Sequence, residues 1–142
     1  MNLVDANVLV YAYNRDAERH EEARGWLDQA LSGGSRVGLA WAPLLAFVRL
    51  VTRRGLFPAP VSPDVAMAQV QEWLAQPGAE LVQPTPRHPF VLAELLQSAG
   101  LGGNLVNDAH LAALAIEHRA AIVSYDDDFD RFPVRWSRPA DR

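Results

Sequence analysis

Several residue types and sequence features are missing from this chain of 142 residues. It contains no cysteine, which excludes a disulfide framework and a thiolate zinc site and suits a reducing compartment. No apolar run is long enough to span a bilayer, and no basic region precedes the first hydrophobic residues. We therefore expect a cytoplasmic protein with no membrane partner.

Lysine is also absent, because all 13 basic residues are arginine. This excludes P-loop NTPases, whose lysine binds phosphate, and enzymes that form a Schiff base. The formal net charge of -4 argues against a broad polyanion-binding surface but allows local arginine clusters around an acidic pocket. With 49% hydrophobic residues, the chain has the size of one ordinary globular domain, and no second domain fits.

Short apolar runs alternate with helical patterns along the chain. Strands are predicted at 3–4, 36–40, 80–83 and 120–125, and helices at 17–31, 44–54, 64–75, 90–98 and 105–119. Asp16 is a possible N-cap of the first of these helices, and Ser62 with Pro63 has the pattern of an N-cap and first turn. No hairpin signal joins the strands, so we expect an α/β fold with a mainly parallel sheet covered on both faces.

An acid interrupts the apolar run that opens the protein. Asp5 follows Leu3 and Val4, so it should lie at the carboxyl end of a buried strand, where open α/β sheets bind ligands. A buried carboxylate there needs a helix cap, a salt bridge, a raised pKa or a cation. The position of Asp5 by itself does not distinguish among these.

Further acids occupy equivalent positions. Asp108 stands in the first turn of a predicted helix, and Asp126 and Asp128 follow the last predicted strand. Three distant segments would thus bring carboxylates to one sheet edge, where they repel one another unless protonated or bridged by a cation. An all-oxygen set favours Mg²⁺ or Mn²⁺ over zinc. Taken singly, Asp108 can also complement the helix dipole, and residues 126–130 can form a solvated turn.

Three motifs carry a resemblance to a known family. They are Leu-Val-Asp-Ala-Asn-Val-Leu with Asp5, Asn-Leu-Val-Asn-Asp-Ala-His-Leu-Ala-Ala-Leu-Ala with Asp108, and Ile-Val-Ser-Tyr-Asp-Asp-Asp-Phe with Asp126 and Asp128. Together they resemble PIN-domain ribonucleases, close to the VapC toxins of toxin-antitoxin pairs, from residue 2 to about residue 136. The resemblance implies that residues 1–142 form a single PIN-like domain, a three-layer α/β/α sandwich with a central, mainly parallel sheet.

The same resemblance implies a function. It is that of a divalent-metal-dependent endoribonuclease, the toxin of a toxin-antitoxin system, which hydrolyses RNA phosphodiester bonds, forms a homodimer and is inhibited by a cognate antitoxin. Asp5, Asp108 and Asp126 would hold Mg²⁺ or Mn²⁺, which activates a water, and Asp128 would orient a ligand or that water. These four aspartates are the candidate catalytic residues.

One position departs from the family pattern. The family usually has a glutamate just before an apolar-apolar-Arg group, and here Ala46 precedes the group that ends at Arg49. Either fewer ligands suffice, or Glu94 or a water replaces the acid, or metal binding is weaker.

Other polar residues have weaker functional signals. Ser124 matches a small hydroxyl position of the family and could hydrogen-bond a ligating carboxylate, although an ordinary serine at a strand end is the favoured interpretation. Asn7 could serve likewise or simply shape the turn. His110 is not expected to be catalytic, because residues two apart on a helix point to different faces and Asp108 therefore points elsewhere. Arginines that could line an RNA path, or simply be solvated, are Arg49, Arg53, Arg54, Arg131, Arg135 and Arg138.

Two other functions are compatible with parts of the sequence. A PIN-like module without the full acidic set could bind RNA or an antitoxin without cleaving. A haloacid-dehalogenase-like phosphatase is less favoured: its nucleophile loop is similar to Asp5-Ala6-Asn7-Val8, but it needs an aspartate in place of Asn7 and a later lysine. Metal-dependent cleavage of RNA separates the nuclease from the binding module.

Overall fold

The structure is a computed structural model that describes residues 1–55, 59–100, 103 and 105–141. In these residues the strands form one parallel sheet with the order β3-β2-β1-β4-β5. The strands are β1 (Asn2–Val4), β2 (Val37–Leu39), β3 (Ala79–Leu81), β4 (Ala121–Val123) and β5 (Trp136–Ser137). The prediction of a parallel sheet is confirmed, and β5 is an addition at its edge.

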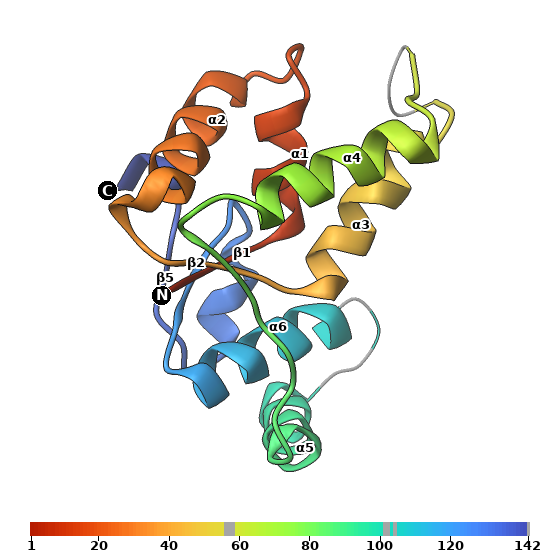
Figure 1. Cartoon of the computed structure of the whole chain (residues 1–142). Coiled ribbons are helices and arrows are strands. Elements are labelled where there is room, and N and C mark those ends of the chain that lie inside the picture. Colours follow the sequence, from red (N-terminus) through yellow and green to blue (C-terminus); the bar gives the residue numbers. More distant parts are fainter. Residues whose placement is uncertain (56–58, 101–102, 104, 142) are drawn as a thin grey trace.

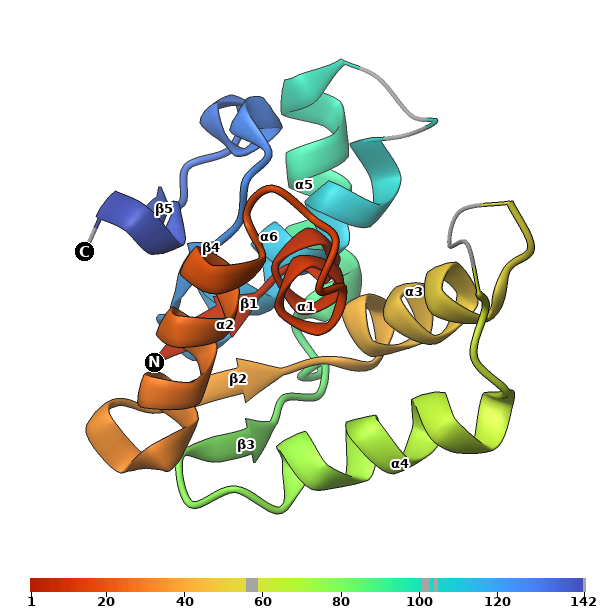
Figure 2. The same cartoon turned by 90° about the horizontal axis from the view of Figure 1, so that it is seen from above.

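Helices cover both faces of this sheet (Figures 1 and 2). On one face lie α1 (Ala6–Tyr13), α2 (His20–Gln29), α3 (Trp41–Thr52) and α4 (Pro63–Leu74). On the other face lie α5 (His88–Ala99) and α6 (Leu105–His118). The predicted three-layer arrangement is therefore confirmed. No described helix has the length and apolar character needed to cross a membrane.

Local signals explain several helix ends. The Ser62 hydroxyl accepts a hydrogen bond from the backbone N–H of Val65 and so caps α4, with Pro63 in its first turn, as predicted. Gly100, with a φ of 75°, ends α5 in the left-handed conformation. The connector predicted at 100–104 is described only at Gly100 and Gly103, and the rest lies outside the described residues.

Two predicted helix starts are wrong. The second helix begins at His20 and not at 17, with Arg19 at its N-cap position. Asp16 instead donates its backbone N–H to the side chain of Asn14 in the turn after α1, so it does not cap α2. The third helix, expected over 44–54 with Pro43 at its start, begins at Trp41, and Pro43 lies in its first turn as expected. Proline is compatible with that position because the first N–H groups of a helix have no partner within it.

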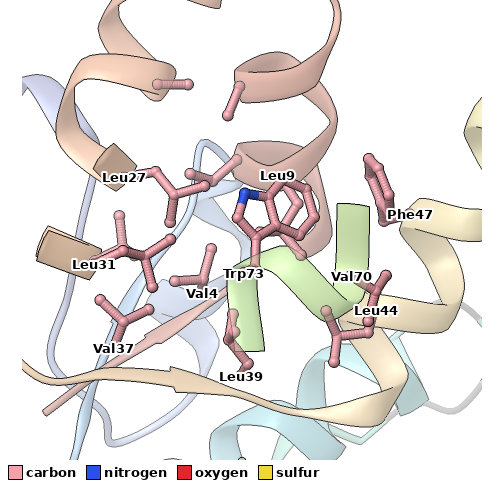
Figure 3. Close-up of a cluster of buried hydrophobic side chains, with 14 of the residues drawn as sticks. Val4, Leu9, Leu27, Leu31, Val37, Leu39, Leu44, Phe47, Val70 and Trp73 are labelled. Carbon is pink, nitrogen blue, oxygen red and sulfur yellow. The ribbon is translucent and has the colours of Figure 1, made fainter. Parts of the chain in front are cut away.

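The central strands β1, β2 and β4 are mostly apolar because both of their faces are buried, whereas the edge strands β3 and β5 are more exposed. Adjacent residues on β1 point to opposite faces, so Val4 joins the core under α1 to α4, and Leu3 joins the core against α6. In the first core the Phe47 ring packs edge-on against Trp73, with centroids 4.7 Å apart. Figure 3 shows this core, where side chains from α1, α2, α3 and α4 meet above the sheet.

The carboxyl ends of the central strands β1 and β4 lie side by side. Asn2, Leu3 and Val4 pair with the three residues of β4, and the backbone N–H of Asp5 extends this ladder by donating to the carbonyl of Val123 at 3.0 Å. The residues that follow the two strands therefore lie together at the sheet edge, as predicted for Asp5 and Asp126.

Candidate active site

Asp5 is both a helix cap and a wall of the site. It follows β1, and its Oδ1 accepts the backbone N–H of Ala6 at 2.8 Å, which caps α1. The same residue lines a cavity at the carboxyl edge of the sheet together with Asp108, Asp126 and Asp128. Asp5 therefore caps α1 and also borders the cavity.

Ser124 ties the ends of β1 and β4 together. Its hydroxyl donates to Oδ2 of Asp5 at 2.7 Å and accepts the backbone N–H of Asp126 at 2.9 Å, and the residue is 0% exposed. The Asn7 amide donates to the Ser124 hydroxyl at 3.1 Å, and its Oδ1 accepts the N–H of Tyr125 at 3.1 Å. The less favoured interpretation of Ser124, a hydrogen bond to an acid, is the one that the structure shows, and the network restrains the position of Asp5.

The tightest group of acids comes from α6 and from the turn after β4. Asp108, Asp126 and Asp128 each offer a carboxylate oxygen, and these oxygens lie within 4.8 Å of one another. Asp126 also accepts the N–H of Asp128 at 2.9 Å, which caps the 3₁₀ turn Asp127–Arg131. Asp5 borders the same cavity but is not a member of this group. The group in the structure therefore contains Asp128 in place of Asp5, compared with the predicted ligand set of Asp5, Asp108 and Asp126.

These oxygens fit a hard divalent cation. Their spacing allows several of them to contact one ion, and carboxylates with room for water are the ligands that Mg²⁺ and Mn²⁺ prefer. The pKa of Asp108 is raised from 3.8 to about 7, first by burial and then by the charges of Asp126, Asp5 and Asp128. Burial also raises the pKa of Asp5, against the opposing hydrogen bonds from Ser124 and Ala6. A cation at this place would relieve the repulsion.

Without metal, we expect the protein to become more stable as the pH falls from about 7 toward about 4. The folded state holds the Asp108 proton more tightly than the unfolded chain, so the penalty for its charge is complete above about pH 7 and disappears as the group is protonated. Asp108 is only half-buried, so after allowance for solvent screening the penalty is about 1 kcal/mol, or about 3 °C in Tm. Thermal melts in chelator should show this slope in the parent and a flatter one in Asp108→Asn. Equal slopes in the two proteins would contradict the raised pKa.

The acidic cavity has a volume of about 810 Å³ and a mixed lining. The four aspartates line it together with Asn7 and Asn107, and the other lining residues come from α1 and α3, with Leu111 from α6. Ala46 borders the same cavity as Asp5. Glu94 is exposed on α5 and is not among the residues that border the cavity, so it does not replace the family glutamate. The residues from α1 and α3 are Ala6, Val10, Tyr11, Ala42, Pro43, Leu45, Ala46, Arg49 and Leu50.

The other polar residues named from the sequence differ in their distance from the cavity. His110 pairs through Nδ1 with Nε2 of His88 at 2.9 Å, and His88 Nδ1 pairs in turn with Glu117 at 2.5 Å, so His110 belongs to the packing of α5 on α6. Arg131 lies 3.7 Å from the Asp128 carboxylate. Of the candidate arginines, Arg49 borders the cavity.

Asn107 and Tyr11 are among the cavity-lining residues that sequence reasoning missed. Asn107 precedes Asp108 in the first turn of α6, and Tyr11 lies on α1. Asn107 lies inside the motif that contains Asp108, so its proximity to the acids could have been inferred. Tyr11 belongs to an apolar run that reads as core, and nothing in that pattern indicates a cavity.

Comparison with known proteins agrees with this geometry. The family model described as "PIN domain" matches residues 3–134. Ribonuclease VapC37 of Mycobacterium tuberculosis is 61% identical over 140 residues, which cover 98% of this chain and 97% of that protein. Ribonuclease VapC43 of the same organism is 39% identical over 142 residues, which cover 99% of this chain and 97% of that protein.

Solved structures share the fold. The crystal structure of Mycobacterium tuberculosis VapC20, described as a sarcin-ricin loop cleaving toxin, matches with a TM-score of 0.72 and 18% identity, covering 98% of this chain and 100% of that one. VapBC2 from Rickettsia felis, bound to a DNA fragment from its promoter, matches with a TM-score of 0.69 and 20% identity, covering 96% and 97%. With a family model that spans most of its length and relatives of high identity over nearly all of it, the chain belongs to the PIN-domain family, among the VapC ribonucleases.

Proposed function

We propose that this chain is a divalent-metal-dependent endoribonuclease and the toxin of a toxin-antitoxin pair. The observation that carries the proposal is the convergence of carboxylate oxygens of Asp108, Asp126 and Asp128 within 4.8 Å, beside Asp5, at the carboxyl edge of the sheet. Its full-length relatives are named ribonucleases, which supports the reaction class.

The residues of the site divide into ligands and supports. Asp108, Asp126 and Asp128 would hold Mg²⁺ or Mn²⁺, with Asp5 as a further ligand or as an acceptor for a bound water. The ion would polarise the scissile phosphate and supply a water of lowered pKa. Ser124 holds the Asp5 carboxylate and the backbone of Asp126 at fixed positions, so the acids are arranged before RNA arrives.

We further propose that the chain acts as a homodimer and binds a small antitoxin. Trp41 and Leu45 on α3 are large apolar side chains that stay 38% and 58% exposed, as expected of a surface that a protein partner covers. An inhibitor could neutralise the acids by placing an arginine among them, since a guanidinium pairs well with carboxylates. The phosphatase alternative is disfavoured, because Asn7 stands where it needs an aspartate and hydrogen-bonds to both Ser124 and Tyr125.

Incubation of the purified chain with total RNA tests the reaction. Cleavage should appear with Mg²⁺ or Mn²⁺ and stop in chelator, and returning the metal should restore it. RNA binding without cleavage under any of these conditions would favour the non-catalytic module.

Induced expression in a bacterial host tests the toxin role. The parent should arrest growth and Asp108→Asn should not. Unchanged growth with soluble parent protein would contradict that role.

Substitution of Ala46 should reveal the position of the missing glutamate. Because Ala46 borders the cavity, Ala46→Glu should add a ligand and lower the Mn²⁺ concentration for half-maximal cleavage by about ten-fold. Ala93→Glu adds the same charge on the exposed face of α5 and is the matched control. If both variants show the metal dependence of the parent, the side chain at position 46 does not reach the ion.

A further inference from the structure

Several residues from α1 and α3 that line the acidic cavity, called the apolar wall below, offer no carboxylate to a cation. Val10 and Tyr11 of α1 face the same space as Pro43 and Leu50 of α3, next to the four aspartates. If the acids held the proposed cation and the cation held the scissile phosphate, the nucleoside attached to that phosphate would lie within this cavity of about 810 Å³. The wall is therefore available to the sugar or base beside the cleaved bond.

Tyr11 is the aromatic residue of this wall, and Tyr125 supports it. The two rings have centroids 5.4 Å apart at an angle of 59°. Tyr125 is held at its backbone N–H by Asn7 at 3.1 Å and at its hydroxyl by Glu22 at 2.7 Å, and the Arg19 guanidinium lies 4.6 Å from its ring centroid. Tyr11 thus borders the cavity with a restrained neighbour behind it, which limits the conformational freedom lost when a ligand binds.

Arg49 supplies positive charge at the same cavity. Among the described residues that border it, Arg49 is the basic one, and it is exposed on α3. The chain carries a formal net charge of -4, so attraction of a polyanion depends on local cations of this kind. A guanidinium binds phosphate oxygens in a bidentate manner.

We infer that Tyr11 is a stacking platform for an unpaired nucleobase next to the cleaved bond and that Arg49 binds a flanking phosphate. The inference rests on the proposed ribonuclease function and adds to it two residues that contact the RNA beside the cleaved bond. Bases in a duplex are stacked on their neighbours and cannot lie on a protein side chain, whereas unpaired bases stack on aromatic rings largely independently of sequence. Tyr125 is a positioning residue for Tyr11.

Binding of labelled RNA to an uncleaving background tests the inference. In Asp108→Asn protein with Mg²⁺, fluorescence anisotropy should show about ten-fold weaker binding of a single-stranded oligouridine to Tyr11→Leu than to the parent background. Tyr11→Phe keeps the ring and should bind like that background. The difference between the leucine and phenylalanine variants should vanish for an abasic strand of the same length. Arg49→Gln should weaken binding to both strands and should reduce the slope of log K against log salt concentration by about 1, as expected for the loss of one phosphate contact. Arg53→Gln is the control and should bind like the background protein.

The unaltered protein provides a second readout that does not depend on folding of a variant. Photocrosslinking to oligo-4-thiouridine, followed by peptide mass spectrometry, should identify Tyr11, and crosslinks confined to other residues would overturn the inference. Equal oligouridine binding by the leucine and phenylalanine variants would also overturn it. The inference would also be overturned if Tyr11→Leu changed only the sedimentation mass or the binding of an antitoxin and left RNA binding unchanged. That result would assign the apolar wall to a protein partner. If the parent cleaves RNA while these tests fail, the inference alone is wrong, whereas a parent that never cleaves overturns the proposed function.

Discussion

Replacing Asp108 by asparagine should lower the rate of metal-dependent RNA cleavage by at least about 100-fold. Asp108 belongs to the group of three acids whose oxygens lie within 4.8 Å, and it is the one that α6 contributes. The amide is nearly the same size but carries no charge, so one ligand weakens and the site loses one of its negative charges. A calorimetric titration with Mn²⁺ should show weakened or absent binding in parallel with the lost cleavage.

Asp127→Asn is the matched control for this substitution. Asp127 lies in the same run of acids but is exposed, and it is neither in the group of three nor among the residues that border the cavity. It should therefore retain metal binding and cleavage close to those of the parent. Equal losses in the two variants would mean that overall negative charge matters and not the geometry of the site. Full Mn²⁺ binding by Asp108→Asn would remove Asp108 from the ligand set.

Gly78→Ala should destabilise the protein by about 3 kcal/mol and lower its Tm by about 10 °C. A Cβ at this position would lie 2.5 Å from the carbonyl oxygen of Ala30 and 2.9 Å from that of Ser35. Both are backbone atoms, which cannot rotate away. Gly78 also donates its N–H to Leu31 and accepts from Val37, so any shift disturbs the junction between the end of α2 and strand β2.

Gly25→Ala tests whether the close approach at Gly78 causes this loss, and not the removal of a glycine as such. Gly25 lies in α2, is exposed, and has no atom within 4 Å of an added Cβ. Alanine has the higher helix propensity, so this variant should gain about 1 kcal/mol. Chemical denaturation should therefore shift the two variants in opposite directions. A Gly78→Ala protein as stable as the parent would show that the backbone can open there without cost.

The sequence was sufficient for most of the fold because its elements follow from local patterns. Leu3 and Val4 predict a strand buried on both faces. Ser62 marks a helix start because its hydroxyl can cap a backbone N–H, and Gly100 marks a helix end because glycine readily adopts the left-handed conformation. Strand β5 was not predicted, since two residues have no recognisable period. It exists because Trp136 and Ser137 pair with β4, which is a tertiary interaction.

The sequence by itself determined that acids follow two strands and open one helix, because each position is set by the element it belongs to. Only the tertiary structure decided which of these acids come within reach of one cation. The Asp5 carboxylate accepts hydrogen bonds from Ser124 and from the first N–H of α1. Asp128, in contrast, lies beside Asp126 because its N–H donates to the Asp126 carboxylate in the 3₁₀ turn. Such distances join segments more than 100 residues apart, so they depend on how helices and strands pack and on which hydrogen bonds capture each oxygen. The same dependence placed Tyr11, an ordinary core residue by its pattern, on the wall of the acidic cavity.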